Sequence, residues 1–122
     1  MELAAGILIL ILSILHIVYG EMQPVANVSK ATDDRNLIGS VRVMSLQGGI
    51  LLFAVGLIHI FQFFDVISLS GVAAYFPLGI ILINLFTYIF VAIWKHRELF
   101  SIAAFQLVVF MVIIILQILS IR

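Results

Sequence analysis

The chain has 122 residues, of which 65% are hydrophobic and 10% are charged, and its six basic and six acidic residues cancel. A water-soluble domain needs more polar surface than this. The composition and a mean hydropathy of +1.34 therefore predict an integral membrane protein, with the lipid bilayer as its partner. A neutral chain also lacks the concentrated basic surface that nucleic acids require, and the absence of cysteine excludes disulfides and thiolate metal sites.

Four apolar segments are each long enough for a membrane-spanning helix, which needs about 20 residues. We expect these spans at about residues 3–20, 43–64, 72–94 and 99–121. The connections after the second and third spans are short, which forces the neighbouring helices to lie antiparallel. The predicted fold is therefore all-α: a polytopic membrane protein with four transmembrane helices in an antiparallel up-down bundle, forming a single domain over residues 1–122.

The first connection, residues 21–41, is the longest predicted loop. Pro24 and Asn27 disfavour helix in its first half. Residues 32–34 (Thr-Asp-Asp) then offer a helix N-cap followed by acidic side chains, which suit the positive end of a helix dipole. We therefore expect the second helix to begin near residue 33 and to project from the membrane before it enters the bilayer.

The distribution of basic residues predicts the orientation. With four spans, the first and third connections lie on one side of the membrane, and together they carry five basic residues: Lys30, Arg35, Arg42, Lys95 and Arg97. The termini and the middle connection carry only Arg122. Basic residues favour the cytoplasmic side. We therefore expect a multi-pass protein of the cell membrane, with loops 21–41 and 95–98 cytoplasmic and both termini outside.

Polar side chains inside the predicted spans fall into two layers when depth is counted at roughly 1.5 Å per residue. The inner layer contains His16, Gln47, Asn84, Thr87 and Gln106, and the outer layer contains His59, Gln62 and Gln117. Polar groups are costly in lipid, so they either bond between helices and fix the packing or line a polar path or ligand site. Amides commonly join membrane helices, which favours the first role. We expect His59 to face protein, with Gln62 or Gln117 nearby.

Histidines on neighbouring helices can ligate a haem iron. His16 lies near the inner end of its span and His59 near the outer end of the next, about 15 Å apart along the membrane normal, which is too far for one iron. His96 lies in the charged inner turn. The sequence contains no recognisable nucleophile arrangement, metal cluster or phosphate-binding loop, so we expect neither a catalytic site nor a bound metal or cofactor.

Small residues on the second span predict close helix packing. Ser45, Gly49 and Gly56 remove side-chain bulk and let another backbone approach. We expect the second helix to be the main contact surface inside the bundle, with Leu52 on its outer face.

Two functions agree with these features. The favoured one is a small non-catalytic accessory or structural subunit of a larger membrane-embedded complex, of redox or transport type, whose partners are other membrane subunits. The alternative is a self-assembling small transporter or channel that uses the intramembrane polar layer.

Overall fold

The structure is a computed structural model that describes residues 1–102 and 104–121. Two residues lie outside the described ranges: Ala103, which is part of the predicted fourth span, and Arg122, which was counted with the termini. Helices make up 87% of the described residues, and these residues contain no strand. The prediction of an all-α fold is therefore confirmed.

The helices follow the predicted spans closely, with the largest difference at the first connection. In chain order they are α1 (Glu2–Gly20), a π turn (Glu21–Val25), α2 (Ala26–Ala31), α3 (Arg35–Phe63), a 3₁₀ turn (Gly71–Tyr75), α4 (Phe76–Trp94), α5 (Leu99–Ile102) and α6 (Ala104–Ser120). Three continuous helical stretches, of 30, 29 and 24 residues, are long and apolar enough to cross a membrane. The apolar helix α6 is shorter.

The first half of the 21–41 connection is helical, so the prediction that Pro24 and Asn27 disfavour helix there is wrong. The π turn and α2 continue α1 as far as Ala31, and only residues 32–34 separate α2 from α3. Pro24 lies inside the π turn. A proline lacks the backbone N–H that the helical ladder needs, and a π turn accommodates it because its hydrogen bonds reach one residue further along the chain.

The start of α3 agrees with the predicted cap to within two residues. The Asp34 side chain accepts hydrogen bonds from the backbone N–H groups of Asn36 (2.9 Å) and Leu37 (3.3 Å). The Thr32 hydroxyl accepts from the Asp34 N–H at 3.1 Å. The two bonds to the Asp34 side chain satisfy two of the donors that a helix start leaves free, which explains why α3 begins at this point.

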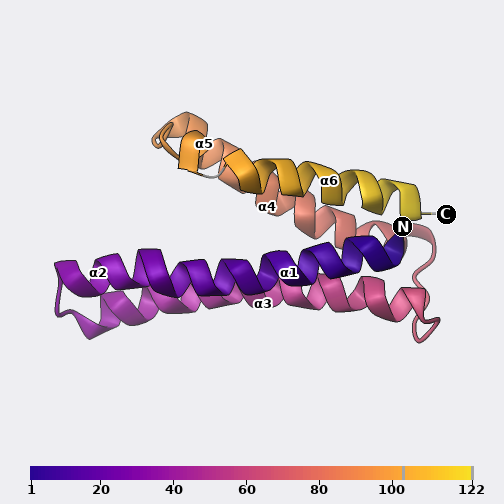
Figure 1. The fold of residues 1–122 in the computed structure, drawn as a ribbon, viewed down its shortest axis with the longest axis horizontal. Coiled ribbons are helices and arrows are strands. Elements are labelled where there is room, and N and C mark those ends of the chain that lie inside the picture. The colour runs from indigo at the N-terminus through magenta and orange to yellow at the C-terminus, as the bar shows by residue number, and fades with distance from the viewer. Residues whose placement is uncertain (103, 122) are drawn as a thin grey trace.

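The helices form two hairpins (Figure 1). In the first, α1 and α2 lie along α3, and in the second, α4 lies beside α6. The hairpins meet at the end of the molecule that holds both termini and diverge toward the opposite end, where α2 and α5 lie. The four long helices therefore share one core only near the terminal end, and the up-down bundle is open at the other.

The shared core lies where the hairpins meet. Its buried apolar side chains come from all four long helices: Ile9, Leu12, Leu52, Val55, Ile81, Leu85, Phe110, Ile113 and Ile114. Leu52 is among them and only 2% exposed, so the prediction that it lies on an outer face is wrong. Apolar residues cover every side of α3, and hydropathy alone cannot distinguish a face in contact with protein from one in contact with lipid.

Small residues bring the backbones of α1 and α3 together. The Ser13 hydroxyl donates to the Gly49 carbonyl oxygen at 2.9 Å. A Cβ atom added at Gly56 would lie 3.1 Å from the Gly6 carbonyl oxygen, and one added at Gly6 would lie 3.1 Å from that of Gly56. Nearer the other end of the hairpin, a Cβ at Gly20 would overlap Ser45. The close approach is consistent with the predicted packing role of Ser45, Gly49 and Gly56.

The turn between α4 and α5 is held by polar contacts. The Tyr88 hydroxyl donates to the Leu99 carbonyl oxygen, and His96 Nδ1 lies 3.1 Å from Glu98 Oε1. Hydrogen bonds to its own backbone N–H and to His96 lower the pKa of Glu98, so this carboxyl group is ionised at neutral pH. The Tyr88 bond fixes the position of α5 at the open end of the second hairpin.

Candidate functional site

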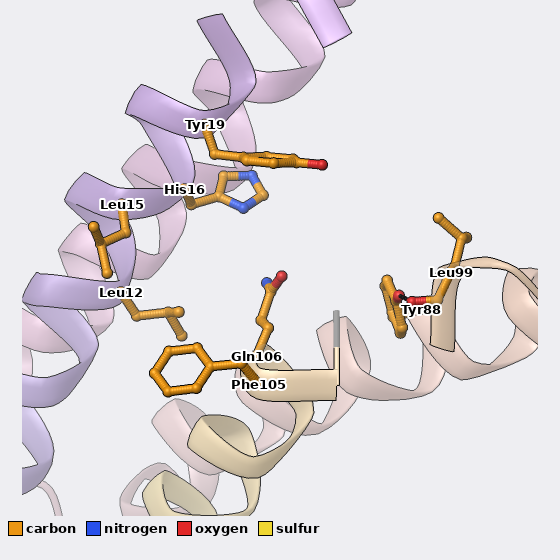
Figure 2. A pocket seen from close by; sticks show the side chains of 8 residues that line it. All are labelled: Leu12, Leu15, His16, Tyr19, Tyr88, Leu99, Phe105 and Gln106. Atoms are coloured by element: carbon orange, nitrogen blue, oxygen red, sulfur yellow. Dashed lines mark hydrogen bonds between the residues drawn. The ribbon is translucent and has the colours of Figure 1, made fainter. Parts of the chain in front are cut away.

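The divergence of the two hairpins leaves a cavity of about 280 Å³ between α1 and the second hairpin, here called the hairpin cavity. Eight residues line it: Leu12, Leu15, His16, Tyr19, Tyr88, Leu99, Phe105 and Gln106 (Figure 2). Four come from α1 and the rest from α4, α5 and α6. The cavity therefore depends on how the two hairpins are placed, and no single helix forms it.

His16 is positioned by a glycine on the neighbouring helix. A Cβ added at Gly48 of α3 would lie 3.0 Å from His16 Nε2, so the missing side chain leaves space for the imidazole ring. Tyr19, one helical turn further along α1, places its ring close to that imidazole (Figure 2). The α1 wall of the cavity thus combines an imidazole and a phenol on an otherwise apolar surface.

Gln106 supplies the amide of the opposite wall. Its side chain projects from α6 into the cavity, toward the α1 wall (Figure 2). Tyr88 uses its hydroxyl to bond Leu99, and this is the one hydrogen bond among the eight lining residues (Figure 2). The cavity therefore presents an imidazole, a phenol and an amide that do not bond one another.

The hairpin cavity is uncharged and aromatic. None of its eight lining residues is Asp, Glu, Lys or Arg, and three of them, Tyr19, Tyr88 and Phe105, carry six-membered aromatic rings. A charged ligand group would lose its hydration on entering without gaining a counter-charge, which is costly. The walls therefore favour a neutral, apolar group that carries a few hydrogen-bonding atoms.

A second, smaller cavity of about 110 Å³ lies at the end of the molecule that holds the termini, and is here called the terminal cavity. Its lining residues are Glu2, His59, Gln62, Leu69, Ala74, Leu78, Gln117, Ser120 and Ile121. His59 and Gln117 are buried, and the Gln117 amide nitrogen lies 2.8 Å from His59 Nε2. The prediction that His59 faces protein, with Gln62 or Gln117 nearby, is confirmed, and the neighbour is Gln117.

The His59–Gln117 pair leaves two buried polar atoms, His59 Nδ1 and Gln117 Oε1, without a hydrogen-bond partner among the described residues. With the amide nitrogen as donor, His59 Nε2 accepts, and a neutral ring then carries its proton on Nδ1. One donor and one acceptor thus remain free beside a polar cavity. Water meets both requirements, because it donates and accepts at once.

The predicted polar layers are only partly brought together. His59, Gln62 and Gln117 of the outer layer line the terminal cavity, and His16 and Gln106 of the inner layer line the hairpin cavity. The other three inner-layer residues lie apart from both cavities. Gln47 and Thr87 are on exposed faces of α3 and α4, and the Asn84 amide donates to the Ile80 carbonyl oxygen of its own helix at 2.9 Å.

Comparison with protein-family models, with curated protein sequences and with solved structures gives no match to this chain. The two cavities and the exposed faces of the helices are thus the features from which a function can be argued. Within the described residues, no group of three or more His, Cys, Asp or Glu side chains is placed to hold a metal ion.

The aromatic lining of the hairpin cavity, Tyr19, Tyr88 and Phe105, was not predicted from the sequence. One signal was present for Tyr19, which follows His16 by three residues and therefore shares its helix face. Tyr88 and Phe105 reach the cavity through the packing of the second hairpin, for which the sequence carries no comparable signal.

Proposed function

We propose that this chain is a small non-catalytic subunit of a larger membrane-embedded assembly, of redox or transport type. The three long apolar helical stretches support membrane insertion, and α6 has 17 residues, close to the lower limit for a span. Both termini lie at one end of the molecule, as four crossings require (Figure 1). We place that end outside the cell, because the opposite end carries most of the basic residues.

One observation carries the proposal of a partner: the Gln47 amide lies on an exposed face of α3, within the expected span. Met44, Leu51 and Ala54 lie on the same face by their helical spacing and are also exposed, and together with Gln47 they are here called the outer face of α3. An amide exposed to lipid loses its hydrogen bonds with water, whereas a polar group on a partner helix restores them. The opposite side of α3 is already occupied by α1.

Native mass spectrometry of the endogenous protein, released in a mild detergent, tests the proposal. We expect the chain to leave the membrane bound to different chains at a fixed stoichiometry. A chain recovered only as a monomer would contradict the proposal.

A small transporter is the second candidate, and the arrangement of the cavities favours it. The hairpin cavity lies on the open side of the shared core and the terminal cavity at the closed end, with the apolar core between them. Two separate cavities on either side of an apolar core suit a protein that opens alternately to the two sides of a membrane. Recovery of the chain as a homo-oligomer alone would favour this candidate over the accessory subunit.

A further inference from the structure

The hairpin cavity has the chemistry of a ligand site. Its volume of about 280 Å³ is close to the lower limit of about 300 Å³ that is usual for small-molecule pockets, so it accommodates a single ring but not a whole lipid. The ring systems of Tyr19, Tyr88 and Phe105 provide flat apolar surfaces in its walls. Aromatic walls favour a flat ligand, because rings stack face to face with an offset or edge to face.

The polar groups of the cavity determine what such a ring must carry. His16 and Gln106 approach from opposite walls, and neither bonds another lining residue (Figure 2). An imidazole offers one donor and one acceptor when neutral, and an amide offers both as well. A ring that carries a carbonyl or hydroxyl oxygen at each of two edges would therefore form one hydrogen bond with His16 and one with Gln106. Phosphate and carboxylate head groups are disfavoured, because no Lys or Arg lines the cavity to neutralise their charge.

We propose that the hairpin cavity binds a neutral, flat, lipid-soluble ring compound with hydrogen-bonding oxygens, the chemistry of a quinone head group. His16 and Gln106 bond the oxygens, and Tyr19 and Phe105 contact the ring. Tyr88 forms part of the wall, since its hydroxyl is already bonded to Leu99. The inference rests on the membrane location in the proposed function, because such a ligand is dissolved in lipid.

Equilibrium binding of a decyl-substituted benzoquinone to the full chain, purified in detergent micelles, tests the inference. We expect saturable binding of one molecule per chain. Loss of one hydrogen bond should weaken it by about 3- to 10-fold in each of His16→Leu and Gln106→Leu. Gln62→Leu makes the same chemical change in the terminal cavity and should leave the affinity unchanged. The melting temperature of every variant shows whether it is folded, and Gln106, which is only half-buried, provides the safer substitution.

Several outcomes would overturn the inference. These are non-saturable partitioning of the quinone, equal affinity in wild type and Gln106→Leu, and displacement of the quinone by an anionic phospholipid at equal mole fraction. The assay needs no partner subunit, so failure to bind leaves the subunit proposal standing. Equally, absence of partners in native mass spectrometry leaves a positive binding result standing.

Discussion

At the scale of single residues, the His59–Gln117 pair is a buried side-chain contact between two helices. It joins α3 to α6, so it ties the first hairpin to the second at the end where they meet. Both side chains are almost fully buried, and each depends on the other for its one side-chain hydrogen bond within the described residues. Removing one partner therefore takes from the other its one side-chain hydrogen bond at a buried position.

This dependence predicts non-additive substitutions. Gln117→Leu should lower the free energy of unfolding by about 1–3 kcal/mol, because His59 Nε2 is left buried without a donor. The double variant His59→Leu with Gln117→Leu should cost less than the sum of the two single variants, since no orphaned group remains. Titration with a denaturing detergent, followed by circular dichroism, measures all four chains. Strictly additive costs would show that the contact is not a coupled pair.

For the residues of the candidate sites, the position along each helix could be predicted from the sequence. The side of the helix that each residue faces could be predicted only in part. The depth of His59 and Gln117 follows from counting along each helix, and the structure places them together. The direction in which Gln47 and Leu52 point could not be predicted, because both lie on a helix that is apolar on every side. The rotation of such a helix is set by its neighbours, chiefly by the close approach of α1.

At the scale of elements, the α1–α3 hairpin is held by a repeating set of small residues. On α1 these are Gly6, Ser13 and Gly20, spaced by seven residues, and they lie opposite Gly56, Gly49 and Ser45 of α3. Seven residues are close to two helical turns, so the three positions on α1 share one face. At the Gly6–Gly56 crossing the nearby atoms include backbone carbonyl oxygens, which cannot move aside as a flexible side chain can.

Two alanine substitutions on α3 should therefore have opposite effects. Gly56→Ala should lower the free energy of unfolding by about 1–3 kcal/mol, since its Cβ lies against the Gly6 carbonyl oxygen. Gly39→Ala is the matched control, because a Cβ there meets no atom within 4 Å. It should raise stability by up to about 1 kcal/mol through helix propensity. Thermal unfolding in detergent compares the two, and equal effects would contradict the role of the crossing.

The helices themselves could be predicted from hydropathy and capping, apart from the first connection. Asp34 caps α3 because its side chain accepts from two backbone N–H groups, and that signal is local. Pro24 was misleading, because one turn of π geometry keeps the helix continuous through it. The heptad of small residues on α1 is visible in the sequence, but its significance depends on the matching residues of α3.

At the scale of the whole molecule, the first hairpin is longer than the hydrocarbon core of a bilayer is thick. The 30-residue stretch Glu2–Ala31 measures about 45 Å, against about 30 Å for the hydrocarbon core. Beyond Gly20, the Glu21 carboxylate accepts from Arg42 at 2.9 Å on an exposed surface. In the proposed membrane-inserted state, the parts of α2 and α3 beyond this ion pair therefore lie outside the hydrocarbon.

The orientation can be tested readily because the chain has no cysteine. Single cysteines are placed by Lys30→Cys near the end of α2 and by Ser68→Cys in the exposed connection between α3 and α4. In intact cells a membrane-impermeant thiol reagent should label position 68 and spare position 30, whereas permeabilised cells should label both. Labelling of position 30 alone in intact cells would reverse the orientation.

The central claim, that the chain works by binding other membrane subunits through the outer face of α3, is tested most directly by Gln47→Leu. We expect this variant to bind its partner subunits about 3- to 20-fold more weakly, because one interhelical hydrogen bond in a membrane is lost. The loss is measured as lower recovery of the assembly in mild detergent. The melting temperature of the isolated chain should not change, because Gln47 is exposed. Gln23→Leu, the same change at an exposed position off this face, should leave recovery intact. Equal recovery of both variants and wild type would contradict the claim.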